Sequence, residues 1–296
     1  MREIAQMFDW ENMRYFLAVG RIGTLSGAAR ALEVDHATVS RRVSVLEEHL
    51  NIRLVERLPR ACPLTAAGQR VFDLAQAMDE SAYAIERFVV ASNSPLKGNV
   101  TLSAPPVLVA NFLARQLADF KLAHPRVHLS ISAQSRQVSL GRREADVVLR
   151  LVRPQEETSV VRKLGRLSFD LYASNNYRML HDASAWEFIV YDSDSSDVAQ
   201  QKWLMDIVKD RTIACEIGDI NGHLAAAQAG AGVACLPCFL ADQDPTLRRV
   251  PHEASPFSRD IWLAIHRDLR RSPQIRAVMD FLLKVVGEEF GIASGT

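Results

Sequence analysis

The chain has 296 residues, of which 48% are hydrophobic and 24% charged, a composition typical of two or three ordinary globular domains. Its 35 basic residues balance its 35 acidic residues, which excludes a polybasic protein that coats nucleic acid. The first residues lack the apolar core and cleavage site of a secretory signal, so we expect a cytoplasmic protein whose four cysteines are reduced.

Three helices are predicted near the N-terminus. Residues 10–20 carry Met13, Phe16 and Leu17 at helical spacing, and residues 24–50 form two helices that meet at a tight corner. Asp35 is a residue type that accepts the free N–H groups at the start of a helix, so the third helix is expected to begin there. The inward faces of the second and third helices are Leu25, Ala28, Ala29 and Leu32, then Val39, Val43 and Leu46.

The outward face of the third helix is suited to DNA. It places short residues around one arginine: Ala37, Thr38, Ser40, Arg41, Ser44 and Glu48. Small residues let a helix enter the major groove, hydroxyls bond base edges or phosphate, and arginine can donate two hydrogen bonds to guanine. The alternative is an amphipathic helix pair whose polar faces are only solvated. Context favours DNA, because residues 1–70 hold ten arginines against eight acids, concentrated in this region.

A small wing is predicted after the third helix. The apolar pair Leu54 and Val55 is followed by Pro59 and Pro63, which enforce a turn. The arginines expected to hold DNA phosphates from this wing are Arg53, Arg57 and Arg60.

A long helix follows the wing. Apolar residues recur in steps of three or four: Leu64, Ala67, Val71, Leu74, Met78, Ala82, Ile85 and Val89. Such a stripe packs either on its own domain or on a second copy of the chain, and its place between two domains favours a dimer. Two recognition helices could then address two half-sites on DNA. We assign residues 1–66 to a DNA-binding domain, 67–92 to the linker helix and 93–98 to a hinge.

Residues 14–68, RYFLAVGRIGTLSGAARALEVDHATVSRRVSVLEEHLNIRLVERLPRACPLTAAG, resemble the LysR-type transcriptional regulators, and the resemblance extends over nearly the whole chain. It implies a multidomain protein: a winged helix-turn-helix, a linker helix and an α/β effector domain that looks like a periplasmic binding protein. It also implies DNA-facing positions at His36, Thr38, Ser40, Arg41 and Arg42, with Arg53, Arg57 and Arg60 on the DNA backbone. The chain departs from many relatives at Ala37, where they carry proline, so base preference is not carried over.

Beyond the hinge, predicted strands alternate with helices, which indicates a parallel α/β arrangement. The first lobe should contain strands at 100–103, 127–133 and 145–151, a helix at 106–123 and a short helix near 139–144. The second should contain strands at 188–191, 212–216 and 233–236, while 167–173 and 261–266 cross between the lobes and 273–286 form a closing helix. We therefore expect residues 99–296 to bind a ligand between two lobes, one at 99–166 plus 267–296 and the other at 167–266.

The ligand of such a sheet sits at the carboxyl ends of its strands, beside helix N-termini. Arg150 ends an apolar strand, and its guanidinium could either clamp a carboxylate or form a structural salt bridge with an acid of the cleft. The resemblance adds effector contacts for Ser103 and Gln134. The candidate effector contacts are Ser103, Ala104, Pro105, Pro106, Gln134, Ser135, Arg150, Asp192, Ser193, Asn221 and Gly222. We expect a small organic effector, with carboxylates among the candidates, and no cofactor.

Other kinds of site are less well supported. Cys235 and Cys238 form a CxxC motif that is either a redox switch or a small apolar filler beside a buried strand, and the lack of a thioredoxin-like surround favours the filler. The scattered histidines predict no metal site, and the acidic run 192–197 lacks the glycine and glutamate of a calcium loop. No GxSxG elbow or nucleotide fingerprint occurs. The uncharged stretch 220–241 contains polar residues and Pro237, so it indicates a buried helix and strand rather than a membrane span.

Together these features predict a cytoplasmic transcriptional regulator that binds double-stranded promoter DNA and a small effector, assembles as a homodimer or homotetramer, and has RNA polymerase as a further partner. No enzymatic or membrane function is expected. The alternative is a cytoplasmic solute-binding or enzymatic α/β protein whose N-terminal helices serve only for assembly. The absence of catalytic groups and of an export signal counts against that alternative.

Overall fold

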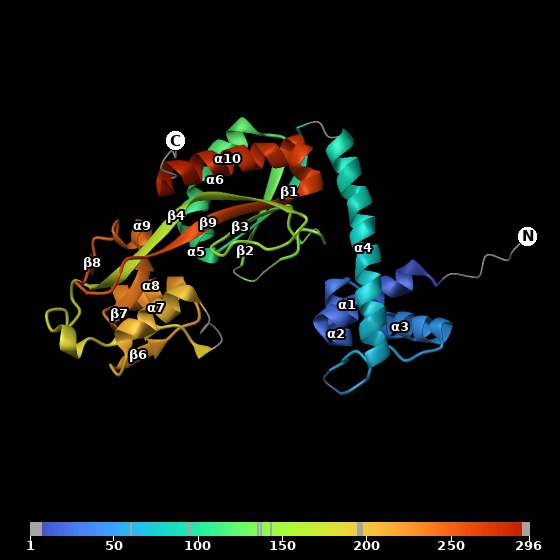
Figure 1. Cartoon of the computed structure of the whole chain (residues 1–296), viewed down its shortest axis with the longest axis horizontal. Coiled ribbons are helices and arrows are strands. Elements are labelled where there is room, and N and C mark those ends of the chain that lie inside the picture. The colour runs from blue at the N-terminus through green and yellow to red at the C-terminus, as the bar shows by residue number, and fades with distance from the viewer. Residues whose placement is uncertain are drawn as a thin grey trace, which may run out of the picture. The chain divides into compact units, whose positions relative to one another are not determined.

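The computed structural model describes residues 8–59, 61–93, 96–134, 136, 138–142, 144–193 and 198–291. Two predicted site residues, Arg60 and Ser135, lie outside the described residues, as do 94 and 95 of the predicted hinge and 194–197 of the acidic run. The chain divides after Glu86 into two compact units (Figure 1). Each unit has its own hydrophobic core.

The first unit begins with three capped helices: α1 (Trp10–Ile22), α2 (Leu25–Ala31) and α3 (His36–Leu50). Each starts where a side-chain oxygen accepts an otherwise unpaired backbone N–H. Asp9 accepts from Glu11 at 2.9 Å, and Thr24 accepts from the Gly27 N–H at 3.1 Å. Asp35 accepts from the Thr38 N–H at 2.7 Å, which confirms the predicted start of the third helix. The predicted inward stripe of α3 is also confirmed, since its three residues Val39, Val43 and Leu46 are fully buried.

The wing after α3 is a narrow hairpin. Val55 pairs with Leu64 in an antiparallel bridge, and the Glu56 N–H donates to the Pro63 carbonyl at 2.8 Å. The hairpin leads directly into α4 (Ala66–Asn93). Gly68 in the first turn of α4 lies so close to the wing that a Cβ there would stand 1.9 Å from a backbone oxygen, which explains the glycine of the LTAAG sequence.

The first part of α4 packs on the helices of its own unit. Phe72 is buried edge-on against Phe16, with ring centroids 6.3 Å apart, and Asp79 accepts a hydrogen bond from Arg21 at 2.6 Å. Another face of the same helix remains exposed and carries Leu74, Met78 and Ile85. Val89, the last residue of the predicted stripe, lies outside the part of the chain whose side chains are described.

The second unit is built on one nine-stranded mixed sheet in the order β2-β1-β3-β9-β4-β7-β5-β6, with β8 paired to β4. Its strands are β1 (Gly98–Ala104), β2 (Val127–Ala133), β3 (Val147–Arg150), β4 (Ser159–Ser174), β5 (Phe188–Val190), β6 (Ile213–Glu216), β7 (Val233–Pro237), β8 (Leu247–Arg249) and β9 (Phe257–His266). Its helices are α5 (Pro106–Leu108), α6 (Ala114–Ala123), α7 (Ala199–Val208), α8 (Ile220–Gln228), α9 (Cys238–Ala241) and α10 (Pro273–Phe290), and the shorter turns are the π-helix η1 (Val109–Leu113) and the 3₁₀ helices η2 (Ala183–Ala185) and η4 (Arg267–Arg271).

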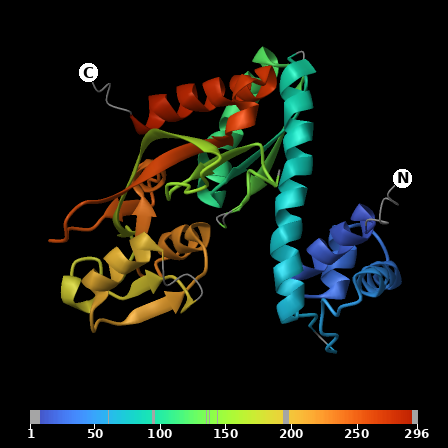
Figure 2. The same ribbon diagram turned by 45° about the vertical axis from the view of Figure 1, so that its right-hand side comes forward.

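The predicted parallel arrangement holds within each lobe but not between them. β1 pairs in parallel with β2 and β3, and β5 pairs in parallel with β6 and β7. The long strands β4 and β9 run antiparallel to each other through both lobes, as Figures 1 and 2 show. The two crossings expected from the sequence are therefore this pair of strands.

Both crossing strands begin earlier than predicted, at Ser159 rather than residue 167 and at Phe257 rather than residue 261. Their early parts are charged, a pattern more typical of loops. In the folded chain these charges compensate one another across the strands, because Asp260 on β9 lies 2.7 Å from Lys163 and 3.4 Å from Arg166 on β4. A single sequence does not reveal this pairing.

Two helix predictions for the first lobe also need correction. The helix predicted near 139–144 is a turn in its described residues, closed by the Glu144 N–H donating to the Ser139 carbonyl at 3.1 Å. The run is too short for a stable helix, and Glu144 also accepts from the Ser139 N–H. The helix predicted over 106–123 has the expected ends, but it is interrupted by the π-helix η1. The strand β8 was not predicted.

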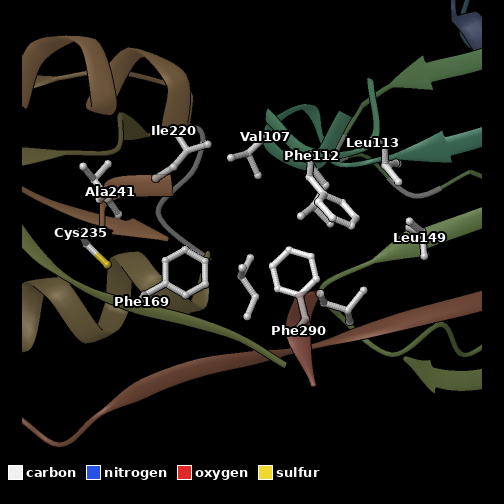
Figure 3. Close-up of a cluster of buried hydrophobic side chains, with 14 of the residues drawn as sticks. Val107, Phe112, Leu113, Leu149, Phe169, Ile220, Cys235, Ala241 and Phe290 are labelled. Atoms are coloured by element: carbon white, nitrogen blue, oxygen red, sulfur yellow. The ribbon is translucent and has the colours of Figure 1, made fainter. Parts of the chain in front are cut away.

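One hydrophobic core runs through both lobes of the second unit. Figure 3 shows Val107 of α5 and Ile220 of α8, which belong to different lobes, pointing into the same cluster as Phe112 and Phe290. The rings of Phe112 and Phe290 meet at a centroid distance of 5.0 Å. Side by side with α6 on one face of the sheet, α10 closes this core (Figures 1 and 2). The lobes therefore share buried apolar contacts and are not joined by the crossing strands alone.

Candidate functional site

The predicted DNA contacts on the outer face of α3 differ in how far they are exposed to solvent. His36, Ala37 and Arg41 are exposed, whereas Thr38 and Ser40 are half-buried. Arg41 makes no hydrogen bond or ion pair with the described residues, and its side chain is exposed to solvent. The Thr38 hydroxyl is already occupied, because it donates to Asp35 at 2.9 Å.

Arg42 is held against α1. It donates to Asn12 at 3.2 Å, lies 3.8 Å from the Asp9 carboxylate, and stacks over the Tyr15 ring at 5.8 Å. These contacts tie Arg42 to α1 and its N-cap, whereas Arg41 is exposed and has no such contact among the described residues. The assignment of Arg42 to DNA stays a prediction.

The wing arginine Arg57 reaches back over α3. It donates to the Ser44 hydroxyl at 2.6 Å and to the Ser40 hydroxyl at 3.4 Å, and it lies 3.5 Å from the Glu47 carboxylate. Ser44 is thus engaged by the wing, and Arg53 is exposed beside it. The hydrogen bonds of Arg57 therefore join the wing to the outer face of α3.

Glu47 shapes this surface and was not predicted from the sequence to do so. One of its carboxylate oxygens accepts the backbone N–H groups of Leu54 at 2.8 Å and Val55 at 3.2 Å, and the other faces Arg57. Glu47 therefore holds the first strand of the wing to α3. The sequence offers no signal for this role, because two adjacent glutamates look alike in it. Only in the folded chain does Glu47 face the wing, while Glu48 is exposed.

In the second unit, Ser103 and Arg150 are brought together at the ends of β1 and β3. The Nη2 of Arg150 donates to the Ser103 hydroxyl at 2.8 Å and to the Arg136 carbonyl at 3.0 Å. Its Nη1 donates to the Ser103 carbonyl at 3.0 Å and to the Leu149 carbonyl at 2.6 Å. Arg150 is buried, and these acceptors are uncharged oxygens rather than the carboxylate of the predicted salt bridge.

A cavity of about 410 Å³ opens beside Arg150, at the end of β3. Of the predicted effector contacts, Pro105 and Arg150 line it. Its other lining residues were not predicted from the sequence and are Val138, Leu140, Val148, Leu151, Val152, Arg153, Pro154, Gln155, Glu156 and Arg259. Most of them lie on the loop between β3 and β4, whose irregular sequence gave no indication of its place.

The remaining predicted contacts of the first lobe make contacts that stabilise the fold. Ala104 is fully buried, and its carbonyl accepts the Gln134 N–H at 2.9 Å. Pro106 starts α5, where proline lacks only an N–H that the helix would leave unpaired. These residues shape the end of the sheet next to the cavity.

The second lobe contributes four predicted residues, Asn221 and Gly222 in the first turn of α8 and Asp192 and Ser193 after β5. Asn221 accepts a hydrogen bond from Asn111 of the first lobe at 3.0 Å, so it links the two lobes directly. A Cβ on Gly222 would lie 2.4 Å from the Ile217 side chain, which indicates a packing role. Asp192 has one buried carboxylate oxygen without a hydrogen-bond partner in the described structure, and Ser193 is exposed.

Arg259, on β9, connects the cavity to the second lobe. It donates to the Gln200 side-chain oxygen on α7 at 2.7 Å, and Gln200 donates to the Tyr191 hydroxyl at 2.8 Å. Burial lowers the pKa of Arg259 and raises the pKa of Tyr191 to about 12. The hydrogen bonds therefore run from an arginine through a neutral amide to a neutral phenol, with no anion among the three groups. Arg259 was not among the predicted contacts, because it precedes residue 261, where the strand was predicted to begin.

The CxxC pair offers no stabilised thiolate. Cys235 is buried, Cys238 is half-buried, and both are free thiols. Burial raises the pKa of both thiols, the opposite of what a reactive cysteine needs. This favours the interpretation of Cys235 as a core filler. Within the described ranges, no cluster of three metal-ligating side chains occurs, and no helix is both long and apolar enough to cross a membrane.

Comparisons with known proteins cover both units. Residues 10–69 match the family described as "Bacterial regulatory helix-turn-helix protein, lysR family", and residues 93–287 match "LysR substrate binding domain". The chain is 25% identical to the Mau operon transcriptional activator of Paracoccus denitrificans over 283 residues, which cover 95% of this chain and 97% of that protein. These matches are to transcriptional regulators and not to enzymes.

Solved structures show the same fold over nearly the full length. Full-length OxyR from Pseudomonas aeruginosa aligns with a TM-score of 0.63 and 18% identity, covering 95% of each chain. CrgA, a LysR-type transcriptional regulator from Neisseria meningitidis, aligns with a TM-score of 0.57 and 23% identity over 95% of this chain and 100% of that one.

Proposed function

The chain belongs to the LysR family of transcriptional regulators, and on this premise we propose that α3 reads promoter DNA while the cavity of the second unit binds the small effector that controls it. The observation that carries the first part of this proposal is the exposed face of α3. It is a polar helix surface with one unpartnered arginine among the described residues, bordered by a wing with exposed arginines.

Arg41 is the residue that we propose for base recognition. It is exposed and near the N-terminal half of α3, next to small residues that allow close approach to the groove. Arg53 and Arg57 would hold phosphates on the flanking backbone, and Arg57 would do so by exchanging its bonds to α3 hydroxyls for bonds to phosphate. The amide groups at the start of α3 add a weak attraction for phosphate.

We propose that the protein acts as a dimer, or as a tetramer built from dimers, with α4 as the dimer contact. Leu74, Met78 and Ile85 are exposed to 59%, 44% and 68% on one face of this helix. Their spacings of four and seven residues match the seam of a coiled coil, and an unpaired apolar seam in water is unfavourable. Pairing would present two copies of α3 to two half-sites, as promoter recognition by a symmetric regulator requires.

Effector control would operate through the two lobes. A ligand in the cavity beside Arg150 contacts the end of β3 and the crossing strand β9, and it changes promoter binding only by preferring one arrangement of the lobes. A carboxylate is among the candidate ligands, since three arginines line the cavity. Acting on promoter DNA, the protein would work in the cytoplasm, with RNA polymerase as a partner wherever it activates transcription.

The proposal is tested by fluorescence anisotropy with the DNA upstream of the protein's own gene. We expect Arg41→Ala to weaken binding roughly 5- to 150-fold, the equivalent of about 1–3 kcal/mol for one base-contacting arginine. Arg14→Ala is the matched control, because it removes the same charge from an exposed position on α1. Its affinity should stay within about twofold of the wild-type value. Equal affinity and equal salt dependence of Arg41→Ala and Arg14→Ala would exclude α3 as the reading helix.

A further inference from the structure

Although Arg150 lines the effector cavity, its terminal nitrogens are fully engaged. A guanidinium has five N–H groups, four of them on the two terminal nitrogens. In Arg150 those four have four acceptors, two on Ser103 and one each on Leu149 and Arg136. A ligand carboxylate would have to break bonds that tie β1, β3 and the loop after β2 together. Arg150 therefore supports the cavity wall.

Arg259 has the opposite character. In the described structure it makes one hydrogen bond, from Nη1 to the neutral side-chain oxygen of Gln200, which leaves four N–H groups without a described partner. The guanidinium is half-buried and lines the same cavity. No carboxylate lies within ion-pair distance of it among the described residues. A partly desolvated cation without a counter-ion is unfavourable, and a bound anion would offset that cost.

The other residues that line the cavity favour a ligand whose uncharged part is apolar. Its walls include the side chains of Val138, Leu140, Val148 and Val152, and its single acidic residue, Glu156, is outnumbered by three arginines. Arg153 is partly engaged over the Trp262 ring at 5.4 Å. At about 410 Å³ the cavity is within the range that holds small organic ligands, roughly 300–1,000 Å³.

We infer that the effector is a small organic carboxylate whose anionic group binds Arg259 and whose apolar body lies against Val148 and Leu140. This inference rests on the proposed effector function of the cavity and assigns its charge-recognising residue. A planar guanidinium with N–H groups available on adjacent nitrogens can bind a carboxylate through two parallel hydrogen bonds.

The position of Arg259 also links occupancy to the second lobe. The bond from Arg259 to Gln200 joins the crossing strand β9 to α7, and Gln200 continues to Tyr191 at the end of β5. A carboxylate on the available N–H groups of Arg259 would share the guanidinium with Gln200, so the ligand would be connected to α7 through this one arginine. Such a ligand binds best in the arrangement of the lobes that keeps the bond from Arg259 to Gln200, which is the differential interaction that effector control requires.

The test uses the full-length protein and thermal-shift titrations with sodium hexanoate and sodium benzoate, and with hexanamide and benzamide as their neutral counterparts. We expect at least one carboxylate to raise the melting temperature below about 10 mM, and its amide to have no effect. Arg259→Gln should weaken that carboxylate roughly ten- to hundredfold, and Arg259→Lys, which keeps the charge but loses the planar fork, should weaken it less. Arg162→Gln, an exposed arginine on β4 away from the cavity, is the control and should bind as the wild type does.

Each other outcome overturns a definite part of the inference. Failure of both carboxylates to bind the wild-type protein, or equal binding of the amides, refutes the ligand class. A shift caused by sodium phosphate and not by the carboxylates identifies an oxyanion site of a different kind. Unchanged carboxylate affinity in Arg259→Gln and Arg259→Lys refutes the assignment of Arg259. Promoter binding by wild-type protein without any probe is measured separately, and its absence would refute the proposed regulatory function instead.

Discussion

Glu47 of α3 accepts two backbone hydrogen bonds from the wing, so we expect its replacement to loosen the wing by a predictable amount. In Glu47→Ala the backbone N–H groups of Leu54 and Val55, which belong to buried residues, lose the carboxylate that accepts them at 2.8 and 3.2 Å. A hydrogen bond to a charged group contributes about 1.5–3 kcal/mol. The nearby ion pair with Arg57 adds little, because the Arg57 side chain is 41% exposed.

We therefore expect Glu47→Ala to lower the local stability of the wing by about 3 kcal/mol, since the longer of the two bonds contributes less than the shorter. Glu47→Gln keeps an acceptor oxygen and loses only the charge, so about 1 kcal/mol is expected. The assay is hydrogen exchange of the Leu54 and Val55 amides in the full-length protein. At about 1.4 kcal/mol per decade, exchange should be roughly a hundredfold faster in Glu47→Ala and roughly fivefold faster in Glu47→Gln.

Glu48→Ala is the matched control, because Glu48 is the adjacent glutamate and is exposed. Its amide exchange at the wing should equal that of the wild type. If Glu47→Ala exchanged no faster than Glu48→Ala at these two amides, the carboxylate would not be holding the wing, and the geometry argued for the DNA-facing surface would be wrong.

Three further predictions follow from packing and charge. Gly68→Ala should lower the unfolding free energy by about 3 kcal/mol and abolish promoter binding, because the new Cβ would meet the Leu54 carbonyl at 1.9 Å. Urea titration measures the first effect, and a variant as stable as the wild type would contradict the prediction. Leu74→Glu combined with Met78→Glu should give a monomer in analytical ultracentrifugation with its helix content kept, whereas a persisting dimer would place the contact elsewhere. Burial lowers the pKa of His223 in the folded chain, so as the pH falls below about 6.5 the unfolded chain takes up the proton first, and the unfolding free energy should decrease by at most about 1.4 kcal/mol per pH unit. His223→Gln should flatten that slope in denaturant titrations, and an identical slope in both proteins would assign it to another group.

Local chemistry made most of the N-terminal unit predictable. Asp35 accepts the first N–H groups of α3, and the buried stripe of that helix repeats every three or four residues, so the helix could be placed from its own sequence. The same periodicity predicted α4, because helical hydrogen bonds join residues four positions apart. Periodicity does not show contacts between residues that are far apart in the sequence. Arg41 and Arg42 look alike in sequence, but Arg42 is bound to Asn12 and stacked on Tyr15.

In the effector unit, too, some features follow from the sequence and others only from the folded chain. Most of its strands and the closing helix α10 follow from hydrophobic patterns, and the cleft was expected where strands end. The early parts of β4 and β9 were not predictable, because their charges are stabilised by partners on the other strand, such as Lys163 with Asp260. The roles of Arg150 and Arg259 were also decided by the folded chain.

The sequence by itself determined where the three N-terminal helices, α4 and α10 lie, which face of α3 is buried, and that a polar helix with an exposed arginine precedes a two-lobed α/β unit. These properties depend on neighbours a few residues apart. Only the tertiary structure decided which arginine supports the cavity and which is available to a ligand, because a guanidinium's partners are set by strand register. Ser103 pairs with Val148, two residues before Arg150, and so brings its oxygens within reach of that side chain, whereas Arg259 on a different strand reaches α7.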